Sequence, residues 1–299
     1  MAGLGANISA NFQINSRMSG SISLGGTSYN SWFFEDVGNG IQGFMGDRTI
    51  PSTHMEFIEG TACTIDFFNQ SPMDHTIHLH GLDVDQVNDG VGDTSFTVFP
   101  GNSNIYSFVA PHAGTYHYHC HVDTTLHYAR GMYGTVIVRP PSGSTSVAWD
   151  GGPSFDEEVL WQLSSFDSTW MNGFSSGSGT ARFRPDLFTI NGFETAAATA
   201  DPYTRVVATV GQKVYLRVSN SAYNWTRVSL GGLPFEVIDT DGRPMQTSYT
   251  TTSLELGPGE RYGLLLDATT AGTYQGIVEY LNEYTGGVWG DARTEIVIV

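Results

Sequence analysis

Residues 114–138 place a histidine and a methionine at short, fixed distances after a cysteine. His127 follows Cys120 by seven residues, and Met132 follows His127 by five. Thiolate, imidazole and thioether groups are the ligands of a mononuclear type 1 copper site, which takes one thiolate and two imidazoles in a trigonal plane and a weak thioether on the axis. The segment thus offers three of the four ligands, and a second imidazole must come from elsewhere in the chain.

The missing imidazole is expected from residues 72–81, PMDHTIHLHG, which hold three histidines. Successive side chains of a β-strand point to opposite faces of a sheet, so His75 differs in direction from His78 and His80. The same alternation separates Cys120 from its two neighbours. If His75 and Cys120 both point into the core, the sequence encodes two sites back to back. The buried site consists of His75, Cys120, His127 and Met132, and the outward site consists of His78, His80, His119 and His121.

The clustering of the histidines along the chain favours metal binding over a chance occurrence of histidine residues. Eight of the nine histidines lie within residues 75–127, around a single cysteine. His117 shares the outward direction and is expected to orient a ligand, whereas His54 and His112 are interpreted as structural. The other cysteine, Cys63, lies in the apolar run TACTIDFF and is expected to be a buried free thiol. No disulfide framework is predicted.

Length and charge limit the classes of partner. At 299 residues the chain suits two domains of about 150 residues each. Thirty acidic against thirteen basic residues give a net charge of −17, which argues against binding to nucleic acid or to anionic membranes. No apolar run approaches the roughly 20 residues of a membrane span. The first residues lack the features of a signal peptide, so we expect a mature chain from which an export signal has been removed.

Short β-rich runs separated by Gly, Pro, Asn and Asp predict an all-β protein, because little of the chain has helical periodicity. The stretch RPPSGSTSVAWDGGPS, residues 139–154, is rich in Pro, Gly and Ser and is expected to connect two domains. We therefore predict two β-sandwich domains of Greek-key type in tandem. The predicted boundaries are 1–142 for domain 1, including an N-terminal arm at 1–25, 143–154 for the linker and 155–299 for domain 2.

An internal repeat supports this division. Pro100-Gly101 followed by Gly114-Thr115-Tyr116 recurs 158 residues later as Pro258-Gly259 followed by Gly272-Thr273-Tyr274. The second copy lacks the candidate ligands: Thr226, Ser229 and Gly231 stand where the first copy has His75, His78 and His80, and Ile277, Val278 and Glu279 stand where it has His119, Cys120 and His121. Since domain 2 contains neither histidine nor cysteine, it is not expected to hold a type 1 copper.

The two motifs together resemble those of the multicopper oxidase and copper nitrite reductase superfamily. His75-x-x-His78-x-His80-Gly81 resembles the His-Pro-x-His-x-His-Gly motif of laccases, with Thr76 in place of the proline. His119-Cys120-His121, followed by His127 and Gly131-Met132, resembles their His-Cys-His-x3-His-x3-Gly-Met motif. The first gap is five residues here, so this loop is longer than in laccases and shorter than in nitrite reductases.

The resemblance implies cupredoxin-like domains, copper as cofactor and oxidoreductase activity. In that superfamily the type 1 copper passes electrons through its cysteine to a second, histidine-bound copper site, which reduces dioxygen in laccases or nitrite in nitrite reductases. The implied partners are thus a small acceptor and an electron donor, either a small molecule or a redox protein. A full trinuclear cluster is not expected, because domain 2 has no histidine. The alternative is a blue-copper electron carrier or copper-binding protein without turnover.

The resemblance to nitrite reductases also implies a homotrimer, in which domain 2 of one subunit covers the second copper of its neighbour. His78 and His80 would then be catalytic together with Glu279, which stands where those enzymes have the neighbour's imidazole. Their catalytic aspartate corresponds to His78 here. The resemblance further implies an extracellular or periplasmic location.

Overall fold

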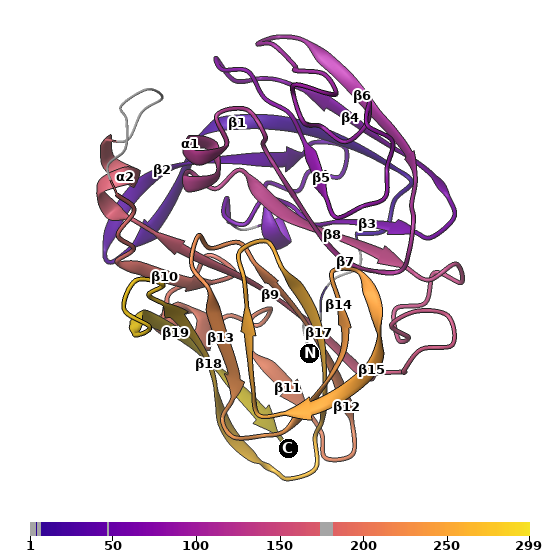
Figure 1. Ribbon diagram of the computed structural model, residues 1–299, viewed down its shortest axis with the longest axis vertical. Coiled ribbons are helices and arrows are strands. Elements are labelled where there is room, and N and C mark those ends of the chain that lie inside the picture. Colours follow the sequence, from indigo (N-terminus) through magenta and orange to yellow (C-terminus); the bar gives the residue numbers. More distant parts are fainter. Residues whose placement is uncertain (1–3, 5–6, 47, 174–181) are drawn as a thin grey trace.

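The computed structural model describes residue 4 and residues 7–46, 48–173 and 182–299. Strands dominate, and they form four sheets, two from each half of the chain. Figure 1 shows the strands of the first half, in indigo to magenta, gathered above those of the second half, in orange to yellow. The prediction of an all-β protein is confirmed.

The first half is a sandwich of two four-stranded sheets, with the orders β2-β1-β4-β6 and β3-β8-β7-β5. Apolar side chains from both sheets, such as Ile65 and Val136, meet in one core. The strands are β1 (Asn11–Leu24), β2 (Thr27–Asp36), β3 (Met55–Ile58), β4 (Ala62–Phe68), β5 (His78–His80), β6 (Ser103–Val109), β7 (Gly114–His119) and β8 (Tyr133–Arg139).

Strand β1 occupies most of the segment that was predicted as an N-terminal arm, residues 1–25. It pairs antiparallel with β2 and parallel with β4. Phe12 and Ile14 are buried, while Asn11 and Gln13, which alternate with them, are exposed. This alternation places one face of the strand on the core. Residues 11–24, within the segment expected as the N-terminal arm of domain 1, therefore form a strand of the first sandwich.

The second half is a sandwich of a six-stranded and a five-stranded sheet, with the orders β10-β9-β12-β17-β14-β15 and β11-β19-β18-β13-β16. Among the described residues, its apolar core contains neither histidine nor cysteine. The strands are β9 (Glu157–Phe166), β10 (Leu187–Ile190), β11 (Val206–Ala208), β12 (Lys213–Asn220), β13 (Thr226–Leu230), β14 (Phe235–Thr240), β15 (Arg243–Thr251), β16 (Ser253–Leu256), β17 (Arg261–Asp267), β18 (Gly272–Leu281) and β19 (Val288–Ile298).

The two halves share their strand connectivity. In the first half β7 lies between β8 and β5, and in the second half β18 lies between β19 and β13. Likewise β4 lies between β1 and β6, and β12 lies between β9 and β17, with the first neighbour parallel in each case. The sequence repeat therefore corresponds to a repeat of the fold.

In the part of the chain that the structure describes, helices are few and short. They are the 3₁₀ turn η1 (Phe44–Gly46) and the α-helices α1 (Thr124–Ala129), α2 (Ser168–Gly173) and α3 (Thr195–Ala200). Within the described ranges, no helix is long and apolar enough to cross a membrane. Helix α1 follows β7 and carries His127, so its placement determines part of the candidate site.

A buried network of charges joins the two sandwiches. The guanidinium of Arg139 on β8 donates to Glu56 on β3, at 2.6 Å, and to Glu158 on β9, at 2.8 Å. Glu158 also accepts from Arg217 on β12, at 2.7 Å, and Arg217 donates to the hydroxyl of Thr115 on β7, at 2.8 Å. Because a buried charge without its partner is strongly destabilising, this network fixes the position of β7 against the second half.

Candidate metal centre

Cys120 lies directly after β7, and its thiol meets two imidazoles inside the first sandwich. Its Sγ lies 3.4 Å from Nδ1 of His75 and 3.1 Å from Nδ1 of His127. All three side chains are fully buried. The three donor atoms lie within 4.8 Å of one another, a separation at which one metal ion contacts all of them. Two backbone hydrogen bonds with Val98 hold His75, and helix α1 holds His127.

Met132 closes the same loop. Its backbone N–H donates to the carbonyl of His127 at 3.1 Å, and its carbonyl accepts from Cys120 at 3.0 Å. The residue before it, Gly131, has a φ of +106°, and a Cβ there would lie 2.3 Å from Ile50. Only glycine adopts this conformation in so tight a space. The Met132 side chain is fully buried in the same apolar core as Cys120.

We call His75, Cys120, His127 and Met132 the buried group. The protonation states of its imidazoles and thiol are suited to a soft metal ion. Burial lowers the pKa of His75 to about 3 and that of His127 to about 4, so both imidazoles are neutral at pH 7. Burial raises the pKa of the Cys120 thiol to about 12, and backbone hydrogen bonds around the sulfur offset only part of this effect. A thiol enclosed by two neutral imidazoles is the donor set that copper converts into a thiolate site.

A second group of histidines lies on the opposite face of the same strands. Strands β5 and β7 are antiparallel, with His78 opposite His119 and His80 opposite His117. Nitrogen atoms of His78, His80 and His119 lie within 4.8 Å of one another. The His121 ring lies further out, with its centroid 5.2 Å from that of His78 and 5.8 Å from that of His119. We call His78, His80, His119 and His121 the outward cluster.

Hydrogen bonds set the tautomers of two members of the outward cluster. Nδ1 of His78 donates to the carbonyl of Asp89 at 2.8 Å, and Nδ1 of His119 donates to the carbonyl of Cys120 at 2.9 Å. Each ring therefore keeps its proton on Nδ1 and has a lone pair on Nε2 for a metal ion. Burial lowers the pKa of His119 to about 3, which keeps its imidazole neutral.

His117 is engaged by neighbours other than the outward cluster. Its Nε2 lies 3.0 Å from the hydroxyl of Tyr128, and its Nδ1 lies 3.5 Å from the side-chain amide of Gln162. Since both ring nitrogens have partners, His117 is better suited to positioning than to metal binding. Tyr128 also packs against His119, with ring centroids 5.4 Å apart.

The chain's own second half covers part of the outward cluster. A pocket of about 190 Å³ is lined by His80, His117 and His119 on one side and by Tyr223, Pro258 and Gly259 on the other. A Cβ added to Gly259 would lie 3.2 Å from the His80 ring. Burial, together with the cation of Arg261, lowers the pKa of His80 to about 4. The expectation that a neighbouring subunit alone covers the cluster therefore needs correction, since His80 is covered within the chain.

Glu279 is not part of either group. It lies on β18 opposite Arg227 of β13, and the two side chains form an ion pair of 3.0 Å. Opposite charges at directly paired positions of adjacent strands are mutually stabilising. Within one chain, the structure thus gives Glu279 a partner in its own sheet.

Several residues around the outward cluster were not among the ligands predicted from the sequence, although Asp89 was considered as part of a polar group at the entrance to the outward site. Asp89 belongs to the polar run GLDVDQVNDG, whose position directly after His80 was the available signal. Arg261 and Gly259 gave no such signal, because the packing of the halves brings them to the cluster, and Tyr128 is brought there by helix α1. Of the same polar run, Asp83 forms an ion pair with Arg243.

Two family models match the chain, and both are described as multicopper oxidase. One matches residues 35–143 and the other residues 161–287, so that together they account for most of the chain. The first range contains every histidine and cysteine named above. Copper is the cofactor of this family.

Curated relatives are similar over about two thirds of the chain or more. A laccase from Cryphonectria parasitica is 30% identical over 201 residues, which are 66% of this chain and 33% of the laccase. Laccase-3 from Botryotinia fuckeliana is 31% identical over 66% of this chain and 43% of its own length. The multicopper oxidase MmcO of Mycobacterium tuberculosis is 26% identical over 74% of this chain and 47% of its own length. The chain spans less than half the length of these relatives.

Solved structures match nearly the whole chain. A blue copper oxidase from Nitrosomonas europaea superposes with a TM-score of 0.76 at 24% identity, over 96% of this chain and 85% of the other. The multicopper oxidase mgLAC superposes with a TM-score of 0.74 at 26% identity, over 96% and 86% of the two chains. These likenesses identify both sandwiches as cupredoxin-like. By its family models, its relatives and its fold, the chain belongs to the multicopper oxidase superfamily.

Proposed function

We propose that the chain is a copper-dependent oxidoreductase that takes electrons at the buried Cys120 group and delivers them to a small acceptor at the outward cluster. The observation that carries this proposal is the position of Cys120. Its thiol belongs to the buried group, while the next residue on either side, His119 or His121, belongs to the outward cluster. A few covalent bonds thus connect the two candidate sites.

The buried group would hold a type 1 copper through His75, Cys120 and His127, with Met132 as the weak axial ligand. Copper, when bound, supplies one-electron redox chemistry, and its ligands tune the potential. The protein's part is to keep both imidazoles neutral, to exclude water by complete burial and to hold the loop rigid through the backbone bonds of Met132. A rigid, dry site needs little rearrangement on electron transfer.

The outward cluster would hold the second copper through His78, His80, His119 and His121. Fixed tautomers at His78 and His119 support this role. The cluster is less enclosed than the buried group, since 16% of the His78 side chain is exposed, and a small acceptor needs such access. We assign dioxygen as the first candidate acceptor, because curated relatives are named laccases, and retain nitrite as the second.

The proposal includes a division of the chain into domain 1 (1–142), a linker (143–154) and domain 2 (155–299). It also includes a location outside the cytoplasm. The repeated strand connectivity supports two domains. In domain 2 the positions of the histidine ligands carry Thr226, Ser229 and Ile277 instead. This domain would therefore act as a cover for the outward cluster rather than as a second redox centre.

We also retain a homotrimer as part of the proposal. Domain 2 of the same chain contacts His80, but His78, His80 and His121 all remain partly exposed. A head-to-tail ring would let each chain cover this side of the next. Glu279 of a neighbouring copy is the candidate contribution, and it would have to share its carboxylate with Arg227. Sedimentation velocity at micromolar concentration tests this part: a monomer that retains copper in the outward cluster would contradict it.

The central experiment measures turnover together with metal content. Copper-loaded protein should oxidise 2,6-dimethoxyphenol with consumption of dioxygen, and the copper content should be two or more ions per chain. The variant Cys120→Ser should lose turnover while keeping the copper of the outward cluster. A protein with one copper and no turnover with dioxygen or nitrite would instead be an electron carrier.

A further inference from the structure

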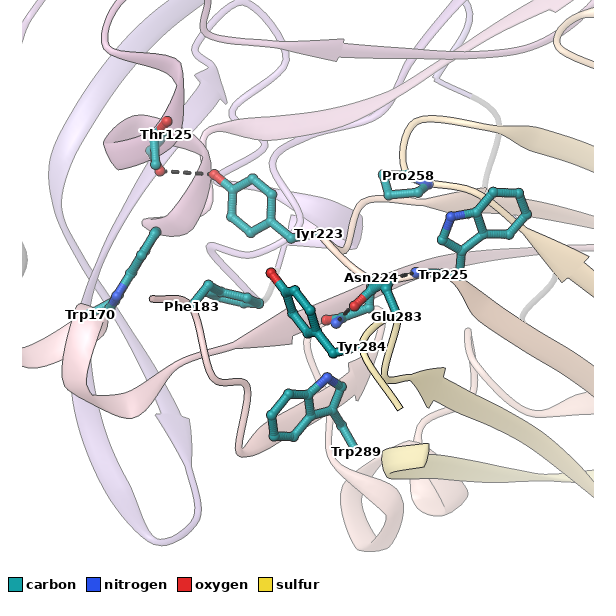
Figure 2. Close-up of a pocket in the computed structure, with 10 residues that line it drawn as sticks. All are labelled: Thr125, Trp170, Phe183, Tyr223, Asn224, Trp225, Pro258, Glu283, Tyr284 and Trp289. Carbon is teal, nitrogen blue, oxygen red and sulfur yellow. Dashed lines mark hydrogen bonds between the residues drawn. The ribbon is translucent and has the colours of Figure 1, made fainter. Parts of the chain in front are cut away.

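Besides the cavity beside α1, which is lined mainly by aromatic rings (Figure 2), the chain has a smaller cavity whose walls include no histidine. Its volume is about 210 Å³. One wall comes from the stretch that connects the two halves, residues 143–154, and the other comes from β14 and the edge strand β15. The lining residues are Trp149, Pro153, Glu236, Ile238, Met245 and Ser248.

The connecting stretch forms a fixed wall because it folds back on itself. The N–H of Ala148 donates to the carbonyl of Pro153 at 3.0 Å, and the N–H of Gly152 donates to the carbonyl of Trp149 at 2.8 Å. The Trp149 ring packs against a buried apolar cluster that includes Ile238. A Cβ added to Gly152 would lie 2.6 Å from this ring, so the ring also lies against the backbone of the turn. This wall is therefore in place before any ligand binds.

An irregularity in the pairing of β14 with β15 forms the other wall. The register of the two strands shifts after Val237, so that residues 245–248 of β15 lie opposite Ile238 alone. Met245 and Ser248, at the two ends of this bulge, both line the cavity. Bulges re-aim side chains and are over-represented at sheet edges and next to functional sites. The bulge thus shapes the cavity from the side of the sheet.

Glu236 brings a carboxylate into a cavity that is otherwise mostly apolar. The hydroxyl of Ser248 donates to its Oε1. Among the residues that the structure describes, its Oε2 has neither a hydrogen-bond donor nor a basic partner. The remaining walls are the side chains of Trp149, Pro153, Ile238 and Met245. A ligand that matches these walls has a cationic hydrogen-bond donor at one end and an apolar body.

The same features argue against other classes of ligand. An anion would be repelled by Glu236 and by the net charge of −17. A divalent metal ion requires more oxygen ligands than one carboxylate and one hydroxyl provide. The volume of about 210 Å³ is below the roughly 300 Å³ at which sites for drug-sized molecules begin. A short aliphatic chain therefore suits the cavity better than a large ring system.

We propose that this cavity binds a primary alkylammonium group, with the ammonium on Glu236 and the alkyl chain against Trp149 and Met245. The ammonium would donate to Oε2 of Glu236, and the nearby indole would add to the attraction for a cation. Free aliphatic amines and lysine side chains share this chemistry. The cavity has no residue in common with either histidine group, so the proposal is independent of the proposed function.

Fluorine NMR of the full chain labelled with 5-fluorotryptophan tests the binding, with n-pentylammonium at pH 7 as the probe. The chain has six tryptophans, and the Trp149 resonance is identified by its absence in Trp149→Phe. We expect a saturable shift of this resonance at millimolar probe, whereas 1-pentanol, which has the same chain and no charge, should cause none. An equal response to 1-pentanol, or similar shifts of several tryptophan resonances, would overturn the proposal.

Two variants separate the carboxylate in the cavity from the overall charge of the protein. Glu236→Gln keeps the size of the side chain and should weaken binding of n-pentylammonium by about tenfold or more. Asp66→Asn removes a negative charge from an exposed position on β4 and should bind within about twofold of the unsubstituted protein. The other tryptophan resonances should keep their positions in both variants, which verifies the fold. Unchanged affinity in folded Glu236→Gln would refute the proposal.

A blocked lysine, Nα-acetyl-lysine methylamide, distinguishes the two sources of the ammonium group. It carries the same ammonium and alkyl chain on a peptide backbone. Affinity comparable to that of n-pentylammonium would support the site and assign it to lysine side chains of another protein. Exclusion of the blocked lysine, with n-pentylammonium still bound, would support the site and assign it to free amines. Failure of both probes to shift the Trp149 resonance would rule the site out.

Discussion

His78 and His119 lie directly opposite each other on adjacent antiparallel strands. In the second half the same relationship joins Ser229 to Ile277, the residues that the repeat assigns to these positions. The outward cluster is therefore a consequence of strand register. A slip of one residue would turn its side chains into the core. The second half keeps the register and lacks the imidazoles, which is why we assign it a covering role.

Replacement of Cys120 by serine should abolish the blue colour of the copper-loaded protein, because thiolate-to-copper charge transfer requires this sulfur. The fold should be retained, since serine is close to cysteine in size. Visible absorption and circular dichroism, measured on the same sample, check this expectation. A blue Cys120→Ser protein would mean that the type 1 site lies elsewhere.

His127 and Met132 should differ in importance within the buried group. His127→Ala should destroy the type 1 site, because it removes one of three strong ligands. Met132→Leu should keep the colour and raise the reduction potential, because the axial thioether tunes the metal rather than holds it. Absorption and redox titration of the two variants distinguish these outcomes. Equal damage from both substitutions would contradict this order of importance.

A methyl group at Gly259 should weaken metal binding by the outward cluster. Its φ is +81°, and the added Cβ would lie 3.2 Å from His80. Gly101, the counterpart of Gly259 in the repeat, has a φ of +75° and no neighbour within 4 Å of such a Cβ. Both alanine variants should lose about 1–2 kcal/mol of stability from the left-handed backbone. Only Gly259→Ala should release copper from the outward cluster, as measured by metal analysis, and equal copper content in the two variants would contradict the contact.

Glu56 should make the protein sensitive to acid. Burial alone would raise the pKa of this carboxyl, but His54 and Arg139 more than offset it and lower the pKa to about 2, from an ordinary value of 4.5. The resulting stability is present above about pH 4.5 and is lost as the pH falls towards 2, because protonation removes the charge that Arg139 requires. The effect is on the order of 3 kcal/mol.

Urea unfolding at several pH values checks this expectation for Glu56. Between pH 4.5 and pH 2 the unsubstituted protein should lose more stability than Glu56→Gln, whose side chain does not titrate. Parallel losses in the two proteins would show that other groups dominate the acid response.

The alternation of side chains along strands made much of the candidate site predictable. His75 and Cys120 lie on one face and His78 and His119 on the other, as a period of two residues requires. Local spacing also indicated that Met132 would lie near His127. These relationships involve residues that are close in sequence or lie on one pair of strands. They can therefore be predicted from the spacing of residues along the chain.

Contacts between the halves were not predictable in the same way. Gly259 and Arg261 reach His80 only because the two sandwiches pack together. No pattern of residues along the sequence predicts how the sandwiches pack. The strand character of residues 11–24 was missed for another reason. Their alternation is present, with Phe12 and Ile14 buried, but polar and small residues make up most of the remainder and weaken the signal.

The charges shared between the sandwiches have a consequence for how the chain unfolds. Arg139 belongs to the first half and Glu158 to the second, and both are buried in the contact between them. A fragment containing either half alone would keep one ion pair, Arg139–Glu56 or Arg217–Glu158, but would lose the buried pair between Arg139 and Glu158 that joins the halves. Although each half has its own core, separating the halves would break this shared buried ion pair, so we expect the two halves to unfold together.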